Sequence, residues 1–252
     1  MALLLSYARR WSIMRRYKLI LTHEVQPKDI TRILITGFPG FGAVGYITTK
    51  YMVEKLRMRR VGYIATPLLP DFTSLEDYGL SLPHEVFIDE HEQLVVLLNR
   101  MNPQKNHINS YVNAVLKLIK ELKIGEVLLI GGLDIRFKEG NEEYRWLKNS
   151  YSRRYLDAPQ FLRGPLIVGP LASLLIALEL KKIPALAIFP YTEPEIVNHK
   201  AAAVALKVIQ QLIGVEIDLS ELLRYAEYIE RMEETLKQMS AQEGHKESMM
   251  YM

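Results

Sequence analysis

The chain has 252 residues, of which 49% are hydrophobic, and this suffices for one α/β domain with a full core. Its 32 basic and 29 acidic residues give a net charge of +3. This balance does not favour a nucleic-acid partner, because nonspecific binding to phosphates needs a concentrated basic surface. The absence of cysteine excludes disulfides, thiolate nucleophiles and cysteine-ligated metal centres, and it favours the reducing environment of the cytoplasm.

Residues 1–16 are predicted to be a disordered extension that precedes the domain. An apolar run over residues 2–5 is followed, not preceded, by arginines, and it is too short for the core of a secretion signal. No apolar stretch reaches the length needed to cross a membrane. We therefore expect the folded part to begin at Tyr17.

The rest of the chain alternates short β-rich runs with segments of helical apolar periodicity. The predicted strands cover residues 17–21, 32–36, 61–66, 85–89, 93–99, 126–130 and 185–189. The predicted helices cover residues 45–56, 110–122, 171–181 and 200–213. The proline-rich residues 67–83 are predicted to be a loop. Because uniformly apolar strands must be covered on both faces, we expect one Rossmann-like α/β domain over residues 17–217, with three layers and a mainly parallel sheet.

A last helix is predicted over residues 218–239. Asp218 and Glu221 have the spacing of a capping box at its start. An apolar seam then recurs at steps of three and four residues: Leu222, Tyr225, Ile229, Met232, Leu236 and Met239. This seam either packs on the domain or serves self-association or partner binding. Residues 240–252 are predicted to be a flexible tail that ends in Met250, Tyr251 and Met252.

A glycine-rich turn over residues 37–45 contains a G-x-G-x-x-G sequence between a strand and a helix, as a dinucleotide site requires. However, the next predicted strand ends at Pro67 without the acidic residue that would bind a ribose. Pro39 also removes an N–H from a loop whose use would be to donate N–H groups to phosphate. We therefore favour a tight strand-to-helix crossover and expect no cofactor.

Other catalytic motifs are missing from the sequence. It contains no nucleophile elbow and no H-E-x-x-H, and its six histidines are scattered, so no catalytic residue or metal ligand is predicted. Glu193 and Glu195 follow a predicted strand at the edge where α/β proteins form ligand sites. A nucleoside- or nucleotide-binding enzyme that uses these residues and the glycine turn is therefore one alternative function.

Residues 136–163 interleave aromatic and basic side chains. Those we single out as a possible interface are Tyr144, Trp146, Tyr151, Arg153, Arg154 and Tyr155. Such a composition can bind single-stranded RNA by stacking and phosphate contact, which gives a second alternative function. It is equally typical of protein interfaces. With a nearly balanced net charge, we favour a protein interface or a lid over an RNA site.

The glycine turn also carries a family resemblance. Residues 36–45, Thr-Gly-Phe-Pro-Gly-Phe-Gly-Ala-Val-Gly, resemble the glycine signature of the proteasome assembly chaperone 2 family. The residues that carry the signature are Gly37, Phe38, Pro39, Gly40, Gly42 and Gly45. Three weaker blocks follow in the same order, at residues 129–133, 164–169 and 212–219, so that the resemblance covers about residues 32–239. The aromatic segment of residues 136–163 departs from the family pattern.

This resemblance implies a phosphorylase-like α/β fold and a noncatalytic, ATP-independent role. Archaeal members of the family are homo-oligomers that bind proteasome α-subunits and assist ring assembly. The resemblance therefore implies a homo-oligomer that binds α-subunits, and it leaves open whether a second chaperone subunit takes part. Several end in a hydrophobic-Tyr-X tripeptide, and Met250-Tyr251-Met252 is similar to that ending. The resemblance thus implies that these three residues dock into α-subunits.

Overall fold

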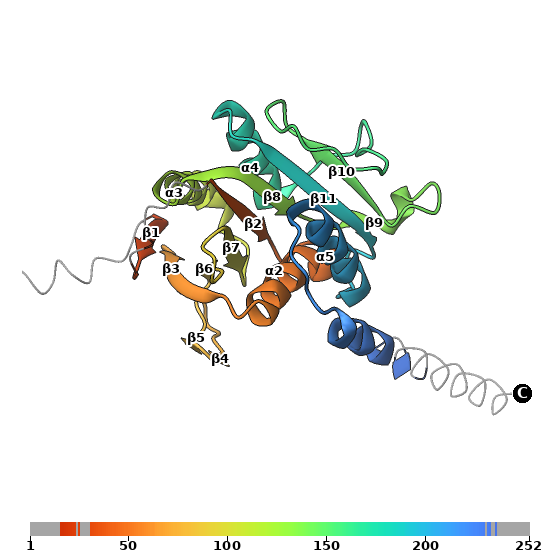
Figure 1. The fold of residues 1–252 in the computed structure, drawn as a ribbon, viewed down its shortest axis with the longest axis horizontal. Coiled ribbons are helices and arrows are strands. Elements are labelled where there is room, and N and C mark those ends of the chain that lie inside the picture. Colours follow the sequence, from red (N-terminus) through yellow and green to blue (C-terminus); the bar gives the residue numbers. More distant parts are fainter. Residues whose placement is uncertain (1–15, 24, 26–30, 230, 233–234, 236–252) are drawn as a thin grey trace, which may run out of the picture.

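The computed structural model describes residues 16–23, 25, 31–229, 231–232 and 235 (Figure 1). The predicted extension, apart from Arg16, and the whole predicted tail lie outside these residues. Within the described part of the chain, no helix is long and apolar enough to cross a membrane.

The centre of the fold is a nine-stranded sheet in the order β1-β3-β6-β7-β2-β8-β11-β10, with β9 paired to β11. Its strands are β1 (Lys18–Leu21), β2 (Arg32–Gly37), β3 (Arg59–Ala65), β6 (His84–Ile88), β7 (Leu94–Asn99), β8 (Ile124–Ile130), β9 (Leu133–Asp134), β10 (Tyr144–Lys148) and β11 (Ala185–Thr192). The inner strands β7, β2, β8 and β11 run parallel, whereas β1, β3, β6 and β10 extend the sheet with antiparallel pairs.

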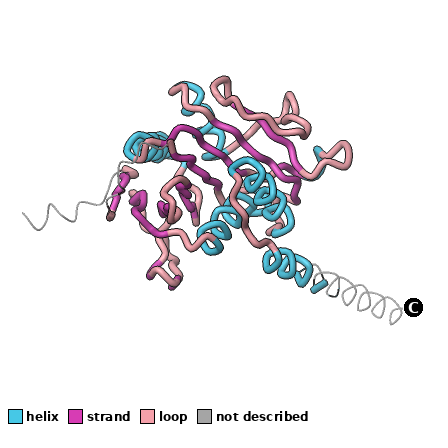
Figure 2. Tube along the Cα trace, in the orientation of Figure 1, coloured by secondary structure: helices cyan, strands magenta, loops and turns pink. Residues whose placement is uncertain are grey.

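Helices cover both faces of this sheet (Figures 1 and 2). The α-helices are α2 (Val44–Lys55), α3 (Ile108–Glu121), α4 (Gly169–Leu180) and α5 (His199–Ile213), and the short 3-10 turns are Phe41–Ala43, Lys105–His107 and Ile135–Phe137. One core lies under α3 and α4, and the other lies under α2 and α5. Successive residues of β2 serve opposite cores, since Leu34 packs in the first and Ile35 in the second. The predicted layered α/β class with a mainly parallel sheet is therefore confirmed.

Two strand features were not expected from the sequence. Residues 67–83, predicted to be a loop, contain a small hairpin made of β4 (Leu75–Glu76) and β5 (Gly79–Leu80). The hairpin turn relies on Gly79, whose φ of +104° lies in a region that favours glycine. The other feature is β10, which pairs antiparallel with β11 and ends the sheet, although its composition suggested only a surface segment.

A helix over residues 220–229 follows α5. The predicted capping box does not form, because the Glu221 carboxylate pairs with Lys55 on α2, while the Asp218 carboxylate accepts the Ser220 N–H at 2.9 Å. The residues of the predicted apolar seam differ in exposure. Leu222 is buried against the domain, whereas Tyr225 and Met232 are half-exposed. Leu236 and Met239 lie outside the described residues.

Candidate functional site

The glycine turn connects β2 to α2 at the carboxyl edge of the parallel strands. A Cβ on Gly37 would lie 2.5 Å from the Cα of Gly45, and a Cβ on Gly45 would lie 2.5 Å from the carbonyl oxygen of Ile130. These approaches are too close for any side chain. Glycine at both positions lets β2, α2 and β8 meet backbone to backbone.

The backbone donors of this turn are directed to the protein itself. The N–H of Gly40 donates to the Phe38 carbonyl at 2.8 Å, and the N–H of Gly42 donates to the Pro194 carbonyl at 3.2 Å. Ala43 likewise donates to the Gly40 carbonyl at 2.9 Å. Because a phosphate would need these same N–H groups, the geometry favours the crossover interpretation over a dinucleotide site.

An apolar cleft of about 260 Å³ lies beside the glycine turn, between β8 and the start of α4. Phe38, Leu133 and Phe161 line its inner part, and the strongly exposed Leu166 and Val168 stand at its mouth. Among the residues that line it, Asn102 alone has a polar side chain, and its amide donates to the Pro39 carbonyl at 3.2 Å. The cleft can therefore bind an apolar group but offers no acid–base pair.

The carboxylates of the enzyme alternative do not reach this cleft. Glu193 and Glu195 are exposed in the loop between β11 and α5, and neither lines it. Within the described residues, no group of three or more histidine and acidic side chains could hold a metal ion. The geometry does not support a small-molecule reaction at this edge.

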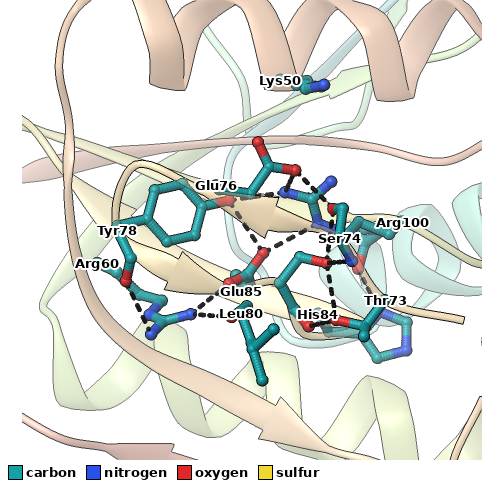
Figure 3. A network of polar contacts seen from close by, with 12 residues as sticks. Lys50, Arg60, Thr73, Ser74, Glu76, Tyr78, Leu80, His84, Glu85 and Arg100 are labelled. Atoms are coloured by element: carbon teal, nitrogen blue, oxygen red, sulfur yellow. Dashed lines mark hydrogen bonds and ion pairs between the residues drawn. The ribbon is translucent and has the colours of Figure 1, made fainter.

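A second surface lies at the other end of the sheet, where residues 68–80 form what we call the apolar hairpin. Its exposed apolar residues are Leu68, Leu69, Phe72, Leu75 and Leu80. A polar network fixes the hairpin from beneath (Figure 3). At its centre lies the fully buried Glu85 of β6, which accepts from Arg60 at 2.8 Å and from the Arg100 Nε at 3.1 Å.

Arg100 then joins this buried carboxylate to the hairpin. It pairs with Glu76 at 3.0 Å, and it donates to the Tyr78 hydroxyl at 2.6 Å (Figure 3). Burial raises the pKa of Tyr78 to about 12, with the Glu85 charge acting in the same direction. Burial works against a charged Glu76, yet the Ser74 hydroxyl and the Arg100 charge lower its pKa overall. Tyr78 thus stays neutral and Glu76 stays ionised at neutral pH.

The aromatic and basic segment after β9 divides between core and surface. Trp146 of β10 is fully buried, and its indole N–H donates to the Ala158 carbonyl at 2.8 Å. Tyr144 is half-buried, and Arg154 donates to Glu126 at 2.9 Å. The exposed members are Tyr151, Arg153 and Tyr155. A stacking surface for RNA would therefore lack the tryptophan, and the predicted interface is reduced to these three exposed side chains.

His84 is a buried histidine that the sequence pattern did not indicate, because it follows Pro83 and precedes the predicted strand of residues 85–89. It lies in β6 with its ring against Tyr17 and Tyr111, and its Nδ1 is 2.8 Å from the Asn99 Oδ1. Burial lowers the pKa of His84 to about 4, from an ordinary 6.5. The one signal in the sequence was the position of His84 directly before a predicted apolar strand.

The pKa of His84 predicts a pH dependence of stability. The unfolded chain binds the proton first as pH falls below 6.5, so stability is complete above this pH and declines until about pH 4. The shift corresponds to about 3 kcal/mol of unfolding free energy. Replacing His84 with glutamine should flatten denaturant-derived stability between pH 6.5 and 4, whereas replacing the exposed His91 with glutamine should not. Equal slopes for both variants would contradict this role.

The described residues thus define an α/β protein with an apolar cleft beside the glycine turn and exposed apolar side chains on the hairpin at the other end of the sheet. The profile of the PAC2 family matches residues 34–237, and the chain belongs to this family. This match confirms the resemblance carried by the glycine signature. A search of curated protein sequences found no match.

Solved structures show the same fold. PbaA of Pyrococcus furiosus, an archaeal homolog of proteasome-assembly chaperone, is 19% identical with a TM-score of 0.71, covering 89% of this chain and 99% of its own. PbaB of the same organism, an archaeal proteasome activator, is 20% identical with a TM-score of 0.71, covering 89% and 100%. A Mycobacterium tuberculosis proteasome-assembly chaperone homologue is 17% identical with a TM-score of 0.62, covering 79% and 93%.

Proposed function

We propose that this chain is a noncatalytic proteasome-assembly chaperone that binds proteasome α-subunits without ATP in the cytoplasm. The family match over residues 34–237 carries the proposal. The names of the similar structures from Pyrococcus furiosus, an assembly-chaperone homolog and a proteasome activator, support it. The glycine turn adds support, because its N–H groups are already bonded within the protein.

The proposed docking element is the carboxyl-terminal tripeptide Met250-Tyr251-Met252, which lies outside the described residues. An extended chain end of this type can bury Met250 in a pocket between neighbouring α-subunits, while the Tyr251 hydroxyl takes a hydrogen bond. The terminal carboxylate of Met252 would pair with a lysine of that pocket. If the chain forms a homo-oligomer, several tails act together through effective concentration.

Truncation after Ser248 tests the tail. We expect the truncated chain to lose at least tenfold in affinity for purified α-subunits, because it removes both the apolar anchor and the terminal charge. Binding would be measured by co-purification and by titration of the full chain and the truncated chain in parallel.

A matched control replaces His245 and Lys246 with alanine, which alters the tail but keeps the tripeptide. Unchanged binding after truncation would refute the tail as docking element. No binding by the full chain would refute the α-subunit partner.

A further inference from the structure

The apolar hairpin is an exposed surface that the protein holds in one shape. Leu69 and Leu75 are more than 80% exposed, at 83% and 81%. The hairpin is nevertheless fixed, since Arg60 donates to the Leu80 carbonyl at 2.9 Å and Ser81 accepts the Ser74 N–H at 2.9 Å. A preorganised apolar surface loses little conformational entropy when a partner covers it, and such patches mark interaction sites.

The charge of this hairpin is uniformly negative. Residues 61–83 contain Asp71, Glu76 and Asp77 and no lysine, arginine or histidine. Glu76 pairs with Arg100, whereas Asp71 and Asp77 are exposed beside the apolar side chains. A partner that covers the leucines must therefore also present basic groups.

The opposite end of the same chain presents such groups. We define the basic patch as the exposed side chains of Lys148, Tyr151, Arg153, Tyr155 and Arg163. Residues 148–163 contain four basic residues and one acidic residue, Asp157. Tyr155 is 71% exposed and rests edge-on against the buried Trp146, with ring centroids 5.5 Å apart. Tyrosine and arginine are enriched among the side chains that contribute most to the energy of protein interfaces.

The two surfaces cannot meet within one molecule. The hairpin leaves the sheet between β3 and β6, whereas the basic patch adjoins β10, the last strand at the other end (Figure 1). Five inter-strand steps separate β6 from β10, which is about 24 Å at about 4.8 Å per step. Complementary surfaces at opposite ends of one chain can be joined only between copies.

We infer that the apolar hairpin of one molecule docks on the basic patch of a second copy of this chain. The contact is head-to-tail, so each molecule uses both surfaces and the copies close into a ring if the rotation permits. The leucines and Phe72 supply apolar burial against Tyr151 and Tyr155, and the aspartates face Lys148 and Arg153. This interface gives the proposed homo-oligomer a defined contact, and it needs no proteasome subunit.

Charge reversal on each surface tests this contact with the purified chain alone. A hairpin variant carries Asp71→Arg and Asp77→Arg, and a patch variant carries Lys148→Glu and Arg153→Glu. We expect sedimentation velocity to show self-association of the natural chain, and at least tenfold weaker association of each variant by itself. An equimolar mixture of the two variants should recover association, because each reversed surface then meets its complement.

The control is Glu90→Arg, which reverses an exposed acid in the β6–β7 turn and should leave association unchanged. Circular dichroism would establish that every variant is folded. A monomeric natural chain, variants that associate like the natural chain, or a mixture that does not recover would each overturn the inference. If the natural chain self-associates as expected but does not bind α-subunits, the result would count against the proposed function and not against this contact.

Discussion

Replacing Gly45 with alanine is expected to destabilise the protein by about 3 kcal/mol or more. The added methyl group would lie 2.5 Å from the Ile130 carbonyl oxygen and 2.7 Å from the Phe38 nitrogen, and both are backbone atoms that cannot rotate away. Relief therefore requires α2 to move off the sheet. In a domain of this size, thermal unfolding should shift down by roughly 6–12 °C.

Gly40 provides the matched control within the same turn. A Cβ built on Gly40 meets nothing within 4 Å, although its φ of −101° and ψ of −146° lie outside the ordinary helical and extended regions. Gly40→Ala should therefore cost only about 1 kcal/mol of backbone strain, clearly less than Gly45→Ala, because the added methyl group meets no neighbouring atom. Calorimetry of the natural chain and both variants would measure the contrast. Equal melting temperatures for the two variants would show that β2, α2 and β8 are not held by glycine contact.

Replacing Glu85 with glutamine should also destabilise the protein by about 3 kcal/mol, because it leaves cations facing a neutral amide in the interior. Glu85 is fully buried and binds both Arg60 and Arg100, and the Arg100 side chain is only 7% exposed. The same change should loosen the apolar hairpin, since Arg100 links it to β6. We expect lower stability in urea and faster proteolysis within residues 68–80.

The control for Glu85→Gln is the same substitution at Glu90, in the turn between β6 and β7. Glu90 pairs with His91, and both side chains are mostly exposed, so the expected change in unfolding free energy is within about 0.5 kcal/mol. Chemical denaturation at pH 7 of the two variants measures the difference directly. A loss of less than about 1 kcal/mol for Glu85→Gln would mean that the buried network contributes little to the fold.

The inner fold was predictable because its signals are local. Strands β2, β7, β8 and β11 consist mostly of apolar and β-branched residues, and the predicted ranges overlap the observed ones. The small hairpin was hidden by Pro67 and Pro70, which suggested an irregular loop. Strand β10 was hidden by Arg145, which is buried with its guanidinium donating to several partners, among them the Tyr191 hydroxyl at 2.6 Å. Tyr191 lies 46 residues after Arg145 in the sequence, so a local pattern of residues cannot reveal that the two side chains meet.

The candidate surfaces were predictable only in part. The glycine turn and its crossover role follow from sequence, because glycine spacing reports local backbone geometry. The Glu85–Arg100 pair was missed, although a charged residue stood at each end of a predicted strand pair. The aromatic segment was predicted as an interface, but composition alone could not separate the buried Trp146 from the exposed Tyr155. Trp146 is buried because β10 places it on the side of the strand that faces the core, whereas Tyr155 lies in the loop after β10.

The position of β2 at the centre of the sheet bears on how the chain is synthesised. Residues 32–37 leave the ribosome early, but their neighbours β7 and β8 end only at Asn99 and Ile130. At about 5–20 residues per second, β2 waits roughly 5–20 s for its second neighbour. During that interval the edge of β2 that later pairs with β8 has no partner strand. The nascent chain of this fold therefore exposes an apolar strand edge, a site prone to aggregation, for seconds during its own synthesis.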